Sequence, residues 1–329
     1  MLKAIAATLI GIEEVAVKEL KEFGCKSLKK VADGRILFTI NEKKLSKLSN
    51  TKSVNAVYTL LDYFKFTDEK AIYERIKHIK FSLKGTFVVR CRHTGEVSSK
   101  DVERNVGEII FNHGHKVNLQ NPDNTVLIDI VKNKCFIGLK LFDGLCKRKY
   151  RIKVNNQGIN ACLAYALLRI SGYTTNKILV DPFCKDGVIV VEAVLFKKGK
   201  VYGIDRSTGN IKASRINAKL ARVFDKISLE NSNISWLDTK FKKGEVDLII
   251  TSPPFISNKM DKQDIEFINR EYKELFYQAK YVLNKKGKML LLCQKGELLQ
   301  AYANDYKFKL LEERKIYSGA MQYTLLIYK

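Results

Sequence analysis

The stretch Ile178-Leu-Val-Asp-Pro-Phe-Cys-Lys-Asp-Gly187 decides the interpretation of this 329-residue chain. Three apolar residues and an acid predict a buried strand, and the apolar run that follows Gly187 and contains Glu192 predicts a helix. Ligands of open α/β sheets bind beyond the carboxyl ends of such strands, where a glycine lets the backbone approach closely. The stretch therefore predicts a ligand-binding turn between a strand and a helix.

The residues around this turn predict a doubly wound parallel sheet over 158–329, because strands alternate with helices. We expect strands at 178–181, 201–205, 226–229, 246–251 and 288–292, and a final antiparallel pair near 308–316 and 322–328. The strand at 201–205 ends in Gly203-Ile-Asp205. A carboxylate at that place can accept hydrogen bonds from both hydroxyls of a ribose, which indicates a nucleoside cofactor.

The strand at 246–251 runs into Ser252-Pro-Pro-Phe255. Two consecutive prolines make this turn rigid, so that it aims nearby acceptors at one point. Ser252 Oγ and the Pro253 carbonyl can accept the two hydrogens of an exocyclic amino group, while Phe255 stacks on the attached ring. We expect this site to need no strong base, because a cofactor with a good leaving group leaves mainly positioning to the protein.

The N-terminal half predicts smaller α+β units. We expect strands at 2–10 and 35–40 around a helix over 12–23, followed by a helix at 41–49. An extended segment at 54–66, a helix at 68–80, a strand at 86–92, a helix at 98–113 and two strands within 125–142 then follow, and Ser98 is expected to cap the second helix. The predicted domains are 1–52, 53–145 and 158–329, with a basic linker at 146–157.

The charge balance points to a polyanion. The chain has 59 Lys and Arg against 35 Asp and Glu, a net charge of +24, of which +11 lies in residues 1–150 and +13 in the rest. An excess spread over the whole chain favours nucleic acid, because each neutralised phosphate releases counterions. The run Lys147-Arg-Lys-Tyr-Arg151 interleaves basic residues with an aromatic one, so we expect it to contact RNA; the alternative is a solvated hinge.

The seven cysteines, at positions 25, 91, 135, 146, 162, 184 and 293, stand far apart and have no histidine at metal-ligand spacing. We therefore expect reduced thiols in a cytoplasmic protein, with no disulfide and no metal. The chain has no run of 18 apolar residues, and its apolar start, 1–12, is too short to cross a bilayer, so we expect no membrane partner. We also expect a monomer.

These motifs resemble those of a known family. Asp181-Pro-Phe-Cys-x-x-Gly187 with Glu192, Gly203-Ile-Asp205 and Ser252-Pro-Pro-Phe255 are similar to the cofactor and catalytic motifs of Rossmann-fold amino-methyltransferases. The N-terminal half resembles a ferredoxin-like domain (1–52) followed by a THUMP domain (53–145), in the stretches 53–61, 86–92, 98–103 and 124–129. The combination resembles the THUMP-containing tRNA guanine-N2 methyltransferases, and the tail 318–329 is more similar to members acting at tRNA position 6 than to those acting at position 10.

The resemblance implies an α/β fold: a C-terminal, doubly wound Rossmann-like domain that binds S-adenosylmethionine, with an N-terminal α+β ferredoxin-like and THUMP module that binds tRNA. It implies N2-methylation of a guanosine, at tRNA position 6 in the acceptor stem, by Ser252, Pro253, Pro254 and Phe255. The residues implied for the cofactor are Asn160, Asp181, Phe183, Cys184, Asp186, Gly187, Asp205, Arg206, Asn233, Ile234 and Ser252. Those implied for RNA are Arg90, Arg92, Lys147, Arg148, Lys149 and Arg151.

Two positions depart from the family pattern. Lys185 stands where relatives have the first glycine of Gly-Ser-Gly, and its side chain would crowd the cofactor if the position needs a positive φ. Asn233 stands where relatives have aspartate, and its amide oxygen can still accept a hydrogen bond from adenine. Asp186 could cap the next helix instead of contacting the ligand, and Glu192 is expected to support the loop through hydrogen bonds. The alternatives are a guanosine-10 enzyme, an RNA-binding protein with an inactive methyltransferase domain, and a DNA amino-methyltransferase.

Overall fold

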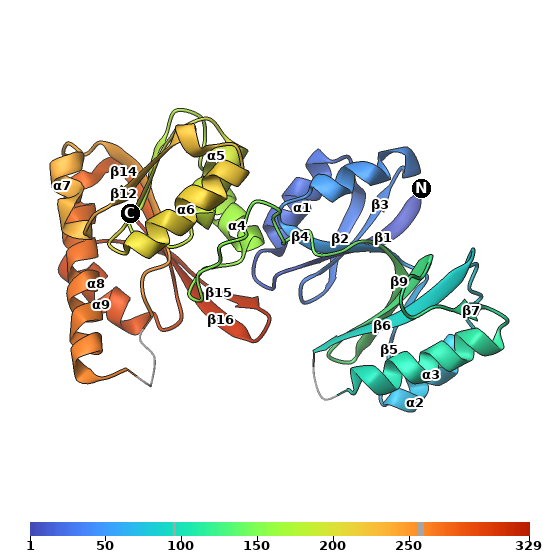
Figure 1. Ribbon diagram of the computed structural model, residues 1–329. Coiled ribbons are helices and arrows are strands. Elements are labelled where there is room, and N and C mark those ends of the chain that lie inside the picture. The colour runs from blue at the N-terminus through green and yellow to red at the C-terminus, as the bar shows by residue number, and fades with distance from the viewer. Residues whose placement is uncertain (95–96, 256–259) are drawn as a thin grey trace. The chain divides into compact units, whose positions relative to one another are not determined.

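The computed structural model describes residues 1–94, 97–255 and 260–329, which form two compact units (Figure 1). The first unit comprises Met1–Thr8 and Ala16–Leu145, and the second comprises Leu9–Val15 and Cys146–Lys329. The segment predicted as a linker, 146–157, thus packs as part of the second unit.

The first unit is built on a nine-stranded sheet with the order β2-β3-β1-β4-β9-β8-β6-β7, and β5 pairs with β9. Its strands are β1 (Leu2–Thr8), β2 (Lys26–Ala32), β3 (Arg35–Ile40), β4 (Val54–Thr59), β5 (Asp62–Lys65), β6 (Thr86–Thr94), β7 (Lys116–Val117), β8 (Asn124–Val131) and β9 (Lys134–Phe142). Segments 1–52 and 53–145 share this sheet, because β1 pairs with β4.

The helices of this half are α1 (Glu13–Glu22), α2 (Glu69–Lys77), α3 (Ser99–Asn112) and the 3₁₀ helix η1 (Glu42–Asn50). Apolar residues of α2 and α3 pack on β6, β8 and β9, and Ala16 and Leu20 of α1 pack in a second cluster with β1 and β3. The predicted cap of α3 is confirmed, since the Ser98 side chain accepts a hydrogen bond from the Asp101 amide.

The second unit holds a seven-stranded sheet with the order β12-β11-β10-β13-β14-β16-β15. Its strands are β10 (Ile178–Asp181), β11 (Lys200–Asp205), β12 (Ile227–Asn231), β13 (Val246–Thr251), β14 (Leu283–Cys293), β15 (Leu310–Ser318) and β16 (Met321–Tyr328). Strands β10 to β14 are parallel, and β16 runs antiparallel to β14 and β15. The predicted doubly wound sheet with a terminal antiparallel pair is confirmed.

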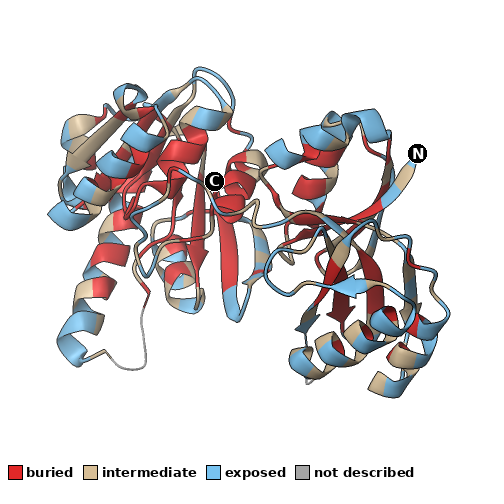
Figure 2. Ribbon diagram, turned by 45° about the vertical axis from the view of Figure 1, so that its right-hand side comes forward, coloured by how far each residue is buried: buried red, intermediate tan, exposed pale blue. Residues whose placement is uncertain are grey.

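Helices cover both faces of this sheet because its strands are apolar on both sides (Figure 2). Leu179 packs in a cluster with α4 (Ala161–Ser171), α5 (Val188–Phe196) and α6 (Thr208–Leu220). Val180, the next residue, packs in the opposite cluster with α7 (Leu237–Lys240), α8 (Lys262–Val282) and α9 (Glu297–Asp305). Short 3₁₀ helices η2 (Phe224–Lys226) and η3 (Ile234–Trp236) flank β12. The strand order reverses between β10 and β13, which is where such sheets bind ligands.

Candidate active site

A pocket of about 420 Å³ opens at the carboxyl ends of β10 and β11 and beside the turn after β13. Phe183, Asp205, Arg206 and Pro254 of the predicted site line it, together with Lys185, the residue that departs from the family pattern. Phe267 and Glu271 of α8 also line the pocket, and the sequence analysis missed both. Their spacing of four residues places them on one face of a helix, but nothing in the sequence shows that this face meets the pocket.

Asp181, the last residue of β10, stabilises the turn that follows it by accepting hydrogen bonds. Thr251 Oγ1 donates to Asp181 Oδ1 at 2.6 Å, and the Phe183 amide donates to the same oxygen at 3.2 Å. The carboxyl group is buried, and burial raises its pKa to about 7. Gly187 has φ +78°, and an added Cβ would lie 2.9 Å from Ser214 Oγ, so this position needs glycine. Asp181 and Gly187 therefore shape the turn.

Asp205 lies at the end of β11, and its carboxylate is fixed by three donors. The amides of Lys185 and Ser207 donate to it at 2.9 Å each, and Asn210 Nδ2 donates at 3.0 Å. Because a carboxylate has about four acceptor sites, one site, on Oδ2, remains to accept a hydrogen bond from a hydroxyl of a bound ribose. Arg206, the next residue, lies 4.0 Å from the centroid of the Phe267 ring, a cation–π contact.

Four further residues predicted to bind the cofactor contact other residues of the protein: Asn160, Cys184, Asn233 and Ile234. Asn160 Oδ1 accepts from the Cys162 amide at 2.7 Å and Asn233 Oδ1 from the Ser235 amide at 3.3 Å, so both cap helices. Neither is among the described residues that line the 420 Å³ pocket, and Ile234 is buried in the apolar cluster around α8. Cys184 is buried in the turn, with its Sγ 3.8 Å from Ser214 Oγ.

The Ser252-Pro-Pro-Phe255 turn follows β13 directly. Ser252 and Phe255 are almost fully buried, and the Phe255 ring lies 6.1 Å from that of Tyr323 on β16. Tyr272 of α8 donates a hydrogen bond to the Pro254 carbonyl at 2.5 Å, which fixes the turn. Nothing in the sequence marks Tyr272 as a site residue beyond the helical period of α8.

Lys185 has a positive φ of +51°, as expected for a position where the family pattern implies glycine, and its side chain lines the pocket. Its Nζ donates to the Gln157 carbonyl at 3.0 Å and lies 3.5 Å from Ser252 Oγ. The same ammonium lies 4.9 Å from the centroid of the Phe255 ring. Lys185 thus joins the turn after β10 to the turn after β13.

Two arginines of the basic run, which were predicted to contact RNA, are held in largely buried ion pairs within the protein. Arg148 Nε donates to Glu192 Oε1 at 2.9 Å, and Tyr150 OH donates to the same oxygen at 2.8 Å. Arg151 Nη2 donates to Asp186 Oδ2 at 2.6 Å. Glu192 therefore supports the basic run rather than the cofactor turn. Gly187, and not Asp186, caps α5.

The other residues predicted to contact RNA lie at the surface. Lys147 and Lys149 are exposed on the second unit. Arg90 and Arg92 lie on β6 of the first unit, where Arg90 is 3.6 Å from Glu103 and Arg92 pairs with Asp143. Salt bridges at such exposed positions are weak, so both arginines remain available to a polyanion.

The expectation of seven reduced cysteines is wrong, because Cys146 and Cys162 form a disulfide with a Cα–Cα distance of 5.3 Å. The other five cysteines are free thiols, and four of them are buried. The two bonded residues are separated by 16 positions, and they meet because the basic run folds back onto the start of α4. Because two of the cysteines are bonded, the cysteines no longer support the expectation of a reducing compartment.

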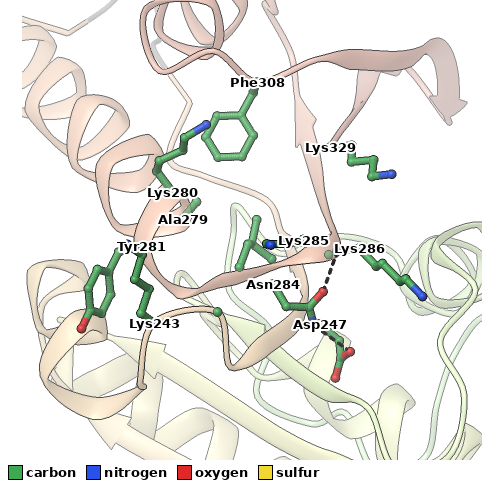
Figure 3. Close-up of a pocket in the computed structure, with 13 residues that line it drawn as sticks. Lys243, Asp247, Ala279, Lys280, Tyr281, Asn284, Lys285, Lys286, Phe308 and Lys329 are labelled. Carbon is green, nitrogen blue, oxygen red and sulfur yellow. Dashed lines mark hydrogen bonds between the residues drawn. The ribbon is translucent and has the colours of Figure 1, made fainter.

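A second hollow, of about 850 Å³, lies at the amino ends of β13 and β14 and contains none of the predicted site residues (Figure 3). Its lining includes Lys243, Lys280, Lys285, Lys286 and Lys329. Asp247, the acid among its lining residues, accepts hydrogen bonds from the Ile178 amide and from Asn284 Nδ2. This hollow lies at the amino ends of the strands, whereas Asp205 and Ser252 lie at the carboxyl ends.

Within residues 1–94, 97–255 and 260–329, no three His, Cys, Asp or Glu side chains are grouped as metal ligands would be. In the same ranges, no helix is both long and apolar enough to span a bilayer.

The pocket fits S-adenosylmethionine in size and in its donor set, because it combines a close backbone turn, a ribose acceptor at Asp205 and the aromatic side chain of Phe183. Two residues that line the pocket, Lys185 and Arg206, are positively charged, and the buried Lys185 ammonium would repel a positively charged cofactor. Fold and site together define a Rossmann-like methyltransferase that uses S-adenosylmethionine.

Comparisons with known proteins agree with this class. Residues 148–324, more than half of the chain, match the family model described as UPF0020, RMKL-like, methyltransferase domain, and residues 66–140 match the THUMP domain. The chain therefore belongs to the RMKL-like methyltransferase family.

Two relatives that match more than 90% of this chain carry the name tRNA (guanine(6)-N2)-methyltransferase. The protein from Archaeoglobus fulgidus is 25% identical over 97% of this chain and 90% of the relative, and that from Methanocaldococcus jannaschii is 22% identical over 94% and 95%. The solved structure of TrmN from Thermus thermophilus has the same fold, with a TM-score of 0.80, 22% identity and coverage of 100% of this chain and 99% of that one.

Proposed function

We propose that this protein transfers a methyl group from S-adenosylmethionine to the exocyclic N2 of a guanosine in tRNA, at position 6 in the acceptor stem. The observation that carries the proposal is that Asp205 and the Ser252-Pro-Pro-Phe255 turn, through Pro254, meet at one pocket at the switch point of the sheet. The names of the two full-length relatives support guanine N2 as the target atom and position 6 as its place.

The residues of the chain have distinct parts in this reaction. Asp205 holds the cofactor through its ribose, and the turn from Asp181 to Gly187 lies against the rest of the cofactor. Ser252 Oγ and the Pro253 carbonyl accept hydrogen bonds from the amino group, and Phe255 stacks on the base. The cofactor supplies an activated methyl group, so the protein contributes orientation and the exclusion of water. The target base must leave its stack to reach a buried turn.

The proposal extends to the RNA. The first unit would bind tRNA through its THUMP region, with Arg90 and Arg92 at its surface, and Lys147 and Lys149 would contact phosphates from the second unit. The predicted division into domains 1–52, 53–145 and 158–329 belongs to this proposal. We further propose that the protein acts as a cytoplasmic monomer.

The test is incubation with unmodified tRNA transcripts and labelled cofactor, followed by mass spectrometry of the nucleosides. N2-methylguanosine is the expected product, and its absence would refute the proposal. A second candidate function, RNA binding without catalysis, is favoured by the Lys185 charge in the pocket. Calorimetry separates the two, since a protein with an inactive domain would not bind S-adenosylmethionine at high micromolar concentration.

A further inference from the structure

The Lys185 ammonium is a buried charge to which the proposed function assigns no part. The side chain is 7% exposed, and it reaches from the turn after β10 to the Gln157 carbonyl, Ser252 Oγ and the face of Phe255. Those last two residues are the ones expected to hold the amino group and the ring of the target base. Lys185 Nζ is therefore buried beside the place where the proposed function puts the target nitrogen.

Three carboxylates face this ammonium: Asp181 on β10, Asp186 in the turn and Asp205 on β11. Each of them has other partners, namely Thr251 Oγ1 at Asp181, Arg151 at Asp186 and the donors at Asp205. Burial is the largest effect on Lys185, and it lowers the pKa of the amine to about 8 in spite of the three acids. At neutral pH this lysine can therefore exchange its proton at little cost in free energy.

We propose that Lys185 gives up its proton when the positively charged methyl donor binds, and that the neutral amine then accepts the proton that the target nitrogen releases. Two positive charges in one small, buried pocket repel each other, so the arrival of the sulfonium favours the neutral lysine. The inference rests on the proposed function for its second half, the proton transfer from substrate.

The proton transfer balances the reaction. The lone pair of the target nitrogen forms the bond to the methyl carbon, and the electron pair of the carbon–sulfur bond stays on sulfur. One N–H proton passes to the lone pair of Lys185 Nζ, which becomes an ammonium again and keeps this proton until the next molecule of S-adenosylmethionine binds, when the proton passes to water. The Ser252 hydroxyl cannot take this part, because a neutral alcohol is a far weaker base than an amine. Lys185 Nζ, which lies 3.5 Å from Ser252 Oγ, is the amine next to it.

The first half of the proposal is tested by proton release without any RNA. Binding of S-adenosylmethionine and of S-adenosylhomocysteine is measured by calorimetry at pH 7.5 in two buffers of different ionisation enthalpy. Both ligands share the same amino and carboxyl groups, so the difference between them isolates the sulfonium charge. Wild type should release up to about three-quarters of a proton more with S-adenosylmethionine, since an amine of pKa about 8 is protonated to that extent.

The matched variants are Lys185→Met, which removes the amine, and Lys226→Met, which removes an exposed lysine at the other end of the sheet, next to the start of β12. Lys185→Met should abolish the difference between the ligands, and Lys226→Met should leave it unchanged. Equal proton release by wild type and Lys185→Met would overturn the proposal, whether or not the protein methylates RNA.

The second half is tested by single-turnover methyl transfer to a tRNA transcript. Lys185→Met and Lys185→Arg should each lower the rate by at least a hundredfold, because arginine keeps the charge but cannot accept a proton. In Lys185→Gly, which suits the positive φ and should fold, added methylamine should restore part of the rate. An unchanged rate in Lys185→Arg would mean that the side chain has only a structural role. If wild type itself forms no N2-methylguanosine, the proposed function fails, while the calorimetric result still decides the proton release by Lys185.

Discussion

Replacing Arg148 by Met tests whether buried charge, rather than contact with RNA, explains the basic run. Glu192 has a fully buried side chain, and that of Arg148 is 11% exposed. The two are joined by a hydrogen bond of 2.9 Å, and Tyr150 donates to the same carboxylate at 2.8 Å. Arg148→Met leaves Glu192 buried without its charged partner, for which we expect a loss of about 3–5 kcal/mol in the free energy of unfolding.

The assay is denaturant unfolding followed by the fluorescence of Trp236, the single tryptophan, which lies in the second unit. The double variant Arg148→Met with Glu192→Gln removes both charges and keeps an acceptor for Tyr150, so it should regain most of the lost stability. Lys147→Met, at an exposed neighbour, should change stability by less than about 0.5 kcal/mol. If Arg148→Met behaves like Lys147→Met, or if the double variant is as unstable as the single one, the buried pair does not hold the segment.

Three further predictions concern the site and its surroundings. Phe255→Ala should lower the turnover rate on saturating RNA and spare cofactor binding, while Asp205→Ala should weaken cofactor binding in calorimetry; an unaltered kcat in Phe255→Ala would exclude the stacking role. Replacing Lys147 and Lys149 together by Met should weaken tRNA binding and leave cofactor affinity unchanged. The slope of log K against log salt concentration should become shallower by about 0.9 for each lost phosphate contact. An unaltered slope would show that neither lysine contacts the RNA. Burial raises the pKa of Asp181 to about 7, whereas an aspartate in an unfolded chain has a pKa of about 3.9. Because the folded state holds this proton more tightly, the free energy of unfolding should fall as the pH rises from about 4 to 7. Asp181→Asn keeps the acceptor for Thr251 and should lack this loss, and parallel pH profiles of the denaturation midpoint in the two proteins would contradict the buried, protonated carboxyl.

The strands that position the site could be predicted because their sequences carry strong local signals. β10 and β13 have the predicted bounds, since each is an apolar run that ends in a polar residue and a proline. β2 was missed, because Lys26–Ala32 is a lysine-rich edge strand without an apolar face, and its formation depends on pairing with β3.

Candidate site residues could be predicted where they end a strand, as Asp205 does, or follow one directly, as Ser252 does. Residues that reach the site from elsewhere in the chain could not: Tyr272 and Glu271 belong to a helix whose period shows an apolar face but not what that face meets. The sequence could not predict the ion pairs of Arg148 and Arg151 either, because their acidic partners lie more than 30 positions away along the chain. Without those partners, the basic run was predicted to contact RNA or solvent. The Cys146–Cys162 disulfide likewise depends on tertiary folding, not on spacing.

The most direct measurement concerns the atom that receives the methyl group. Two tRNA transcripts that differ at position 6, one with guanosine and one with inosine, which lacks the N2 amino group, are incubated with the protein and labelled S-adenosylmethionine. We expect label in N2-methylguanosine from the first transcript and no label in the second. Equal labelling of both transcripts, or label in another nucleoside, would contradict methylation of guanine N2 at this position.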